Sequence, residues 1–116
     1  MSRSKEDAEG GVKFDENKLR YDLIPTEFME ALAWILTFGA NKYGDRNWEK
    51  GMLWSRIFAA LMRHLWAWFR REDNDPETGK PHLWHAAACI CFLVTWEARR
   101  NSPNVSGTDD RPGTAG

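Results

Sequence analysis

The residues best suited to chemistry lie in one short segment, residues 72–85. This segment holds four carboxylates and two histidines around the sequence Pro-Glu-Thr-Gly, and it separates two strongly apolar stretches with helical spacing. A short turn between two helices brings the end of the first, the turn itself and the start of the second close together. Carboxylate oxygens and imidazole nitrogens are common ligands of divalent metal ions. The segment therefore predicts a divalent-metal site.

The candidate metal ligands are the carboxylates and histidines at the two helix ends. Glu72 ends the first helix, Asp75 and Glu77 lie in the turn, and His82 and His85 are three residues apart, which places them on one face of the second helix. We take Glu72, Asp75, His82 and His85 as metal ligands. Oxygen ligands favour Mg²⁺ or Mn²⁺, whereas histidines favour Mn²⁺, zinc or iron. The alternative is a solvated acidic turn in which His82 caps a helix.

A third histidine, His64, lies on the preceding helix. It shares an apolar stripe with Ile57 and Ala60. Such a histidine is more often a core residue with satisfied ring nitrogens than a functional one. Its functional interpretation is a group that supports the metal site, or contacts a substrate, from the interior of the bundle.

Lysines and arginines near these helices could bind phosphate. Phosphate oxygens are bound by such cations, while carboxylates hold a bridging metal ion, so a nucleotide would satisfy both halves of the site. Trp48 offers a stacking face and Asn47 an amide for a base edge, although a tryptophan is more often a core or interface residue. Lys42 ends an apolar stripe, where its stem could simply cover apolar surface. The candidate substrate-binding residues are Lys18, Arg20, Lys42, Arg46, Asn47, Trp48, Arg63 and His64.

Composition limits the classes of function. The chain has 116 residues, 42% of them hydrophobic, and a formal net charge of -1, so we expect one domain and no general attraction to nucleic acid or to an anionic membrane. Cys89 and Cys91 point to different helix faces and form no disulfide framework. The sequence contains no signal-peptide core and no run of about 18 apolar residues. We expect a soluble cytoplasmic protein without a membrane partner or a stable nucleic-acid partner.

The apolar periodicity predicts an all-α fold, a small bundle of three main helices preceded by an extended N-terminal arm. The first helix should begin with Thr26 as its N-cap and end near Tyr43-Gly44. The second should span about residues 52–72 and the third about 81–99, and the third should be central because it is apolar nearly all round.

The ends of the chain differ in composition from the middle. Residues 1–11 and 101–116 are polar, with little to bury, and we expect both to be disordered tails of a domain at residues 12–100. Residues 13–25 lack helical periodicity, and we expect them to form an extended arm laid on the core. So many tryptophans and so apolar a third helix also predict a homo-oligomer, a dimer or a tetramer.

Several motifs occur in order along the chain and together resemble a known family. They are Lys13-Phe14-Asp15, Lys18, Arg20, Asp22-Leu23-Ile24-Pro25, residues 37–44, Asn47-Trp48, Arg63-His64-Leu65, Glu72, residues 75–79 and residues 82–86. This series resembles the dATP/dGTP diphosphohydrolase domain of many phage proteins, over residues 13–97. That family is similar to the MazG-like nucleotide pyrophosphohydrolases. The glutamate pairs of MazG proteins do not occur here at their usual spacing: Glu27 and Glu30 should face solvent, so the ligand assignments above rest on this chain alone.

The resemblance implies a metal-dependent hydrolase. It would use Mg²⁺ or Mn²⁺ to split a purine deoxynucleoside triphosphate, dGTP or dATP, into the monophosphate and pyrophosphate. Some members, called MazZ, supply dGMP to phages that replace adenine by 2-aminoadenine. Within this reaction Glu72, Asp75 and Glu77 are the candidate catalytic residues, with Glu77 orienting water. Lys42, Arg46 and Arg63 would neutralise phosphate charge.

Two other interpretations remain open at the level of sequence. The first is a non-enzymatic phage module that binds nucleic acid through lysines and arginines of the N-terminal half. The second is a structural zinc bundle, because His82, His85 and Cys89 share a helix face and His64 could complete a tetrahedral site. Chelation should unfold a structural zinc bundle, whereas a catalytic site should lose its metal and stay folded.

Overall fold

The fold is all-α, as predicted. The computed structural model describes residues 17–113. Within that part of the chain, three α-helices and three short 3-10 turns follow one another, and no strand is present. The predicted tail at residues 1–11 and the residues up to 16 lie outside the described part. In chain order the elements are η2 (Tyr21–Leu23), α2 (Thr26–Tyr43), η3 (Asn47–Lys50), α3 (Trp54–Phe69), α4 (His82–Ala98) and η4 (Pro103–Val105).

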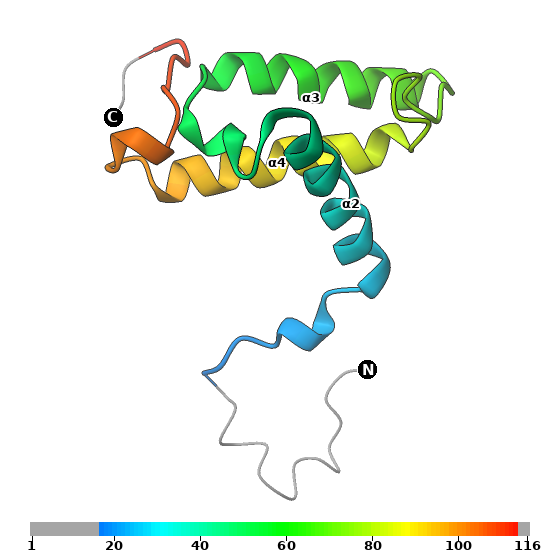
Figure 1. Cartoon of the computed structure of the whole chain (residues 1–116), viewed down its shortest axis with the longest axis horizontal. Helices are drawn as coiled ribbons and strands as arrows, with labels where there is room; N and C mark the ends of the chain where they lie inside the picture. The colour runs from blue at the N-terminus through cyan, green and yellow to red at the C-terminus, as the bar shows by residue number, and fades with distance from the viewer. Residues whose placement is uncertain (1–16, 114–116) are drawn as a thin grey trace, which may run out of the picture.

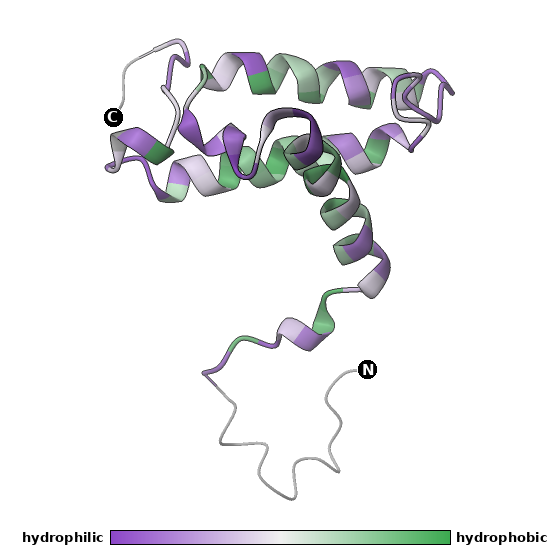
Figure 2. Cartoon of the chain, viewed as in Figure 1, coloured by the Kyte–Doolittle hydropathy of each residue, from purple (hydrophilic) through white to green (hydrophobic). Residues whose placement is uncertain are grey.

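Helices α3 and α4 lie side by side and form the core, and α2 crosses α4 (Figure 1). Green, apolar segments run along α4 and along α2 where these two helices meet (Figure 2). Trp96 is fully buried, and burial of side chains of this size is the main source of stability in a small domain. Helix α4 packs against both other helices, which confirms its predicted central place. The buried cluster consists of Trp54, Ile57, Leu61, Ala86, Cys89 and Trp96.

The residues on either side of helix α2, Pro25 and Gly44, explain where the helix begins and ends. Pro25 precedes the helix with φ -61° and takes the N-cap position, so Thr26 is the first helical residue and not the cap that we predicted. Gly44 follows the helix at φ 100°, a conformation that glycine adopts at little cost, and its N–H donates to the carbonyl of Ala40. The chain therefore turns sharply after Lys42 and Tyr43, toward η3.

The N-terminal segment does not lie on the core, so the prediction of an arm packed there is wrong for residues 17–25. The first half of α2 extends beyond the α3–α4 pair, and the segment before it continues in the same direction, away from both helices (Figure 1). Its apolar side chains are consequently exposed, Leu19 by 76% and Tyr21 by 72%. Within residues 17–113, these side chains are therefore left largely uncovered.

The C-terminal segment differs from the predicted tail, because it returns to the start of α3. The carbonyl of Thr108 accepts from the Trp54 N–H at 2.9 Å, and the carbonyl of Ser106 accepts from the indole Nε1 of Trp54 at 2.7 Å. A Cβ at Gly107 would lie 2.8 Å from the carbonyl oxygen of Met52, so only glycine fits there. The Thr108 carbonyl thus satisfies one of the backbone donors that the start of a helix leaves free. Within residues 17–113, none of the helices combines the length and apolar character needed to cross a membrane.

Candidate active site

The loop between α3 and α4 is folded into a tight turn. The Asp75 N–H donates to the carbonyl of Lys80, and the Gly79 N–H donates to the carbonyl of Asp75. Gly79 has φ 74°, the left-handed conformation that closes such a turn. The His82 N–H donates to the carbonyl of Asp73 at 2.8 Å, which fixes the start of α4 against the loop.

Asp75 is held at the centre of this turn. Its Oδ2 accepts from the backbone N–H groups of Glu77 and Thr78 at 3.1 and 3.2 Å, an arrangement typical of aspartate at a turn. The same oxygen lies 3.8 Å from Nε2 of His85, and the Asp75 side chain is only 16% exposed. The turn therefore points a largely buried carboxylate at the histidines of α4.

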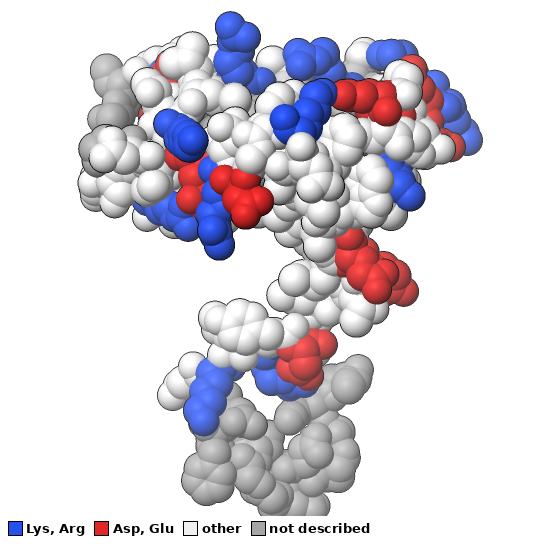
Figure 3. All heavy atoms as spheres, in the orientation of Figure 1, with Lys and Arg blue, Asp and Glu red and all other residues white. Residues whose placement is uncertain are grey.

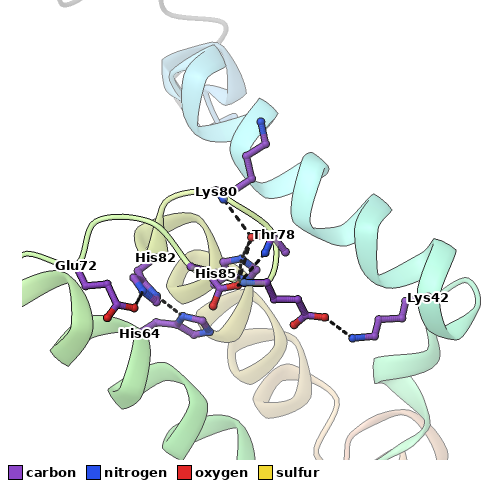
Figure 4. Close-up of polar contacts among 9 residues, drawn as sticks. Lys42, His64, Glu72, Thr78, Lys80, His82 and His85 are labelled. Carbon is purple, nitrogen blue, oxygen red and sulfur yellow. Dashed lines mark hydrogen bonds and ion pairs between the residues drawn. The ribbon is translucent and has the colours of Figure 1, made fainter.

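The three histidines of the chain lie together beside the loop (Figure 4), and all three come close to the Asp75 carboxylate. Nδ1 of His64 lies 2.8 Å from Nδ1 of His82. The ring of His64 also stacks on that of His85, with 4.8 Å between centroids and 10° between planes. His64 comes from α3 and the other two from the first turn of α4, so the helix pair itself brings the rings together.

Three of these side chains could share one metal ion. One ligand atom each from His64, Asp75 and His82 lies within 4.8 Å of the others, and this is the only such group of three or more found in residues 17–113. Two imidazoles and a carboxylate suit Mn²⁺ better than Mg²⁺, which prefers oxygen ligands. The cluster does not include Cys89, so the geometry does not favour the structural zinc site considered above.

Glu72 contacts the cluster through His82. Its Oε2 lies 2.9 Å from Nε2 of His82, on the ring nitrogen opposite the one that faces His64. A carboxylate in this position fixes the tautomer and orientation of a metal-binding histidine. The structure thus brings the predicted ligand Glu72 to the site but places it behind His82. His85, the fourth predicted ligand, bonds Thr78 Oγ1 through Nε2 at 2.8 Å.

Burial lowers the pKa of His64 and His85, which favours their neutral form. The pKa of His64 is lowered to about 4, first by burial and then by the neighbouring His85 and His82. Burial also lowers the pKa of His85, against the opposing charge of Asp75. Neutral imidazoles have the free lone pair that metal binding requires. Burial raises the pKa of Cys89 to about 11, which favours its thiol form.

Helix α2 contacts the loop through two lysines. Lys42 forms an ion pair with Glu77, and this contact raises the pKa of Lys42 (Figure 4). The Lys80 ammonium lies 5.0 Å from the ring centroid of Trp34 and 5.5 Å from that of Trp84, within cation–π range of both. Sequence reasoning identified Lys42 and Glu77 but missed Lys80 and Thr78. The Asp-Pro-Glu-Thr-Gly turn was a signal for Thr78, since a hydroxyl three residues after aspartate commonly joins such a turn.

The remaining predicted substrate residues fall into two groups. Arg46, Asn47 and Trp48 line a pocket of about 360 Å³ between α2, η3 and α4. Trp48 stacks on Phe92 with 4.6 Å between ring centroids. One face of the Trp48 ring is therefore already packed against another side chain of the protein.

The second group, Lys18, Arg20 and Arg63, does not line this pocket. Arg63 is exposed on α3 beside His64 and helps to lower the pKa of that histidine. Lys18 and Arg20 belong to the N-terminal segment that extends away from the helices, and the structure does not bring them to the site (Figure 1). On the face shown in Figure 3, positive and negative side chains are interspersed over the three-helix body.

A larger groove of about 610 Å³ lies at the other end of the helix pair. It is lined mostly by apolar side chains, among them Trp54, Phe58, Ile90 and Val94, with Arg111 at its edge. No histidine lines this groove. Within residues 17–113, the side chains suited to hold a metal ion lie beside the loop between α3 and α4.

The fold and the cluster define the class of protein, a small all-α domain with a candidate divalent-metal centre at one end of a helix pair. Residues 8–110 match the family model described as dATP/dGTP diphosphohydrolase, N-terminal, and the chain belongs to this family, which confirms the resemblance seen in its motifs.

A relative supports the same assignment. The chain is 35% identical over 111 residues to a protein of Salmonella phage PMBT28 named dATP/dGTP diphosphohydrolase. The alignment covers 90% of this chain and 38% of the relative, so the chain spans about two fifths of that protein's length. No solved structure is significantly similar to the chain.

Proposed function

We propose that this chain hydrolyses a purine deoxynucleoside triphosphate, dGTP or dATP, to the monophosphate and pyrophosphate with the help of a divalent metal ion. The observation that carries the proposal is the convergence of His64, Asp75 and His82 within 4.8 Å, in a family named for this activity. The named relative supports the substrate class, since its name refers to dATP and dGTP.

His64, Asp75 and His82 would hold the metal, and the donor set favours Mn²⁺ over Mg²⁺. When bound, such an ion neutralises phosphate charge and lowers the pKa of water at the site. The chain prepares the ligands for that role. Glu72 accepts from Nε2–H of His82, which leaves the Nδ1 lone pair of His82 directed at the cluster.

Lys42 and Glu77 have complementary roles in this proposal. The two side chains are paired without substrate, and both are more than two-fifths exposed, so a triphosphate can reach them. Phosphate oxygens compete for the Lys42 ammonium and release the Glu77 carboxylate, which is then available to orient water and accept its proton. Arg46 and Arg63, both exposed, would add positive charge for the leaving pyrophosphate.

The biological setting is also part of the proposal. We place the reaction in the cytoplasm, which two free cysteines, Cys89 and Cys91, fit. A MazZ-like role, in which dGMP is supplied for a 2-aminoadenine genome, and a relationship to MazG-like enzymes are part of this proposal. We also propose a homo-oligomer, dimer or tetramer, which would cover the exposed apolar side chains of residues 19–28.

The test compares two aspartates of the same loop. Asp75→Asn keeps an oxygen that can accept the turn hydrogen bonds but removes the charge, and we expect dNTP hydrolysis to fall by at least about 100-fold. Asp73→Asn is the matched control: the same change on an exposed residue of the same loop should leave the rate nearly unaltered. Circular dichroism verifies that both variants fold. Equal, full activity in both variants would contradict the role of Asp75 and the proposed metal site.

A further inference from the structure

The pocket between α2, η3 and α4 has the properties of a site for a flat aromatic ligand. Its volume of about 360 Å³ falls in the range of small-molecule sites. Its walls are mostly apolar, with the aromatic side chains of Tyr43, Trp48 and Phe92 among them. Side chains with π-faces bind planar rings, since stacking gains dispersion and excludes water.

Polar groups are concentrated at one side of this pocket, in η3. Asn47 offers an amide donor and an acceptor, the combination that can pair with the edge of a nucleobase. Arg46 precedes it at φ 54°, a left-handed conformation that is costly for arginine and that persists where surrounding contacts enforce it. The Asn47 N–H donates to the carbonyl of Gly44, so the turn after α2 sets the position of both side chains.

Lys42 contacts both the lining of this pocket and the loop that carries the metal cluster. The Lys42 ammonium lies 5.2 Å from the ring centroid of Tyr43, which lines the pocket, and it pairs with Glu77 of the loop that carries Asp75. Lys42 is therefore the cation that would join a phosphate at the cluster to a base in the pocket.

We propose that this pocket binds the purine base of the nucleotide, with the aromatic side chains on its faces and Asn47 at its edge. The identity of the nucleotide rests on the function proposed above. The pocket itself is an independent claim, because a nucleoside without phosphates should bind there without any metal ion.

Gly39 makes the proposal testable without disturbing the fold. It lines the pocket from α2, and a Cβ added there would meet nothing within 4 Å. Gly39→Leu therefore fills the pocket, and leucine is also the better helix former. Ala33→Leu adds a similar side chain to an exposed position of the same helix that does not line the pocket, and it is the matched control.

The first experiment is an NMR titration of the full chain with 2′-deoxyguanosine and 2′-deoxyadenosine in the presence of EDTA. We expect amide shifts centred on residues 36–48, retained in Ala33→Leu and lost in Gly39→Leu. The second experiment measures KM for dGTP and dATP with Mn²⁺. We expect Gly39→Leu to raise KM by at least about tenfold, with Ala33→Leu close to the unaltered chain.

The outcomes separate the two proposals. Nucleoside shifts in this pocket without hydrolysis of any dNTP would support the base pocket and overturn the proposed reaction. Hydrolysis with the same KM in Gly39→Leu, and no nucleoside shifts at residues 36–48, would overturn the base pocket and leave the reaction in place. Nucleoside shifts at the larger apolar groove near Trp54 and Val94, in place of residues 36–48, would also overturn the pocket assignment.

Discussion

Glu72 and His82 form the most informative contact at the scale of single residues. Glu72 lies behind His82, 2.9 Å from the ring nitrogen that does not face His64. A carboxylate in that place acts on the metal site by holding its histidine in one tautomer and one orientation. Glu72 is therefore expected to be a positioning residue, and its removal should weaken the site without abolishing it.

This role predicts the behaviour of Glu72→Gln. The substitution removes the charge but keeps the size, and we expect Mn²⁺ affinity, measured by calorimetry, to fall by about 10- to 100-fold. Because the ligands themselves remain, excess Mn²⁺ should restore dNTP hydrolysis in Glu72→Gln. An unchanged Mn²⁺ affinity would contradict the positioning role. A loss of hydrolysis that excess Mn²⁺ cannot restore would indicate that Glu72 is itself a metal ligand.

Single residues were predictable from sequence where spacing along a helix or turn determines their position. His82 and His85 share a helix face because they are three residues apart. Asp75 is in the turn because one helix ends before it and the next begins after it. Spacing does not say which atom faces which, so sequence alone predicts Glu72 to be a ligand, whereas the structure places its carboxylate against His82. Lys18 and Arg20 were grouped with the site by charge alone, and charge does not locate a segment that extends away from the helices.

At the scale of elements, α3 depends on a segment far from it in sequence. The Asp110 carboxylate accepts from the Ser55 N–H at 2.9 Å and from its hydroxyl at 2.6 Å, so it caps the helix from the C-terminal side of the chain. Periodicity predicted all three helices to within a few residues. It missed this cap because nothing local to residues 101–113 signals a partner more than 50 residues away.

The cap predicts a pH dependence of stability. The Ser55 hydroxyl and N–H lower the pKa of Asp110 below its ordinary 3.8. The unfolded chain therefore binds this proton more readily, and the stabilisation is complete above pH 3.8 and lost as pH falls through the folded pKa. In thermal unfolding, Asp110→Asn should have a lower Tm than the unaltered chain at pH 7. The difference should shrink as pH falls below 3.8, and a difference independent of pH would contradict the assignment.

At the scale of the whole molecule, the exposed apolar surface is the feature that a single chain does not explain. Leu19, Tyr21, Leu23 and Phe28 are each about half exposed or more, in a segment that contacts neither α3 nor α4 in Figure 1. Large apolar side chains left exposed on one segment are typical of an interface. The sequence predicted association from its tryptophans and its apolar third helix. It could not say that the N-terminal segment would add exposed apolar side chains to those of the helix pair, such as Phe69 and Val94.

The proposed association has a direct measurement. Light scattering coupled to size exclusion should give the mass of two or four chains for the unaltered protein. Leu23→Asp places a charge among the exposed apolar side chains and should shift the mass toward one chain. Asn17→Asp adds the same charge at a polar position of the same segment and should not. A single-chain mass for the unaltered protein at micromolar concentration would contradict the proposal.

The central claim is the reaction, and product analysis tests it most directly. The purified chain is incubated with each of the four dNTPs in Mn²⁺, in Mg²⁺ and in EDTA, and the products are separated by chromatography. We predict that dGTP, dATP or both give the monophosphate and pyrophosphate, faster with Mn²⁺ than with Mg²⁺ and not at all in EDTA. No turnover of any dNTP, or release of single phosphates in place of pyrophosphate, would contradict the account.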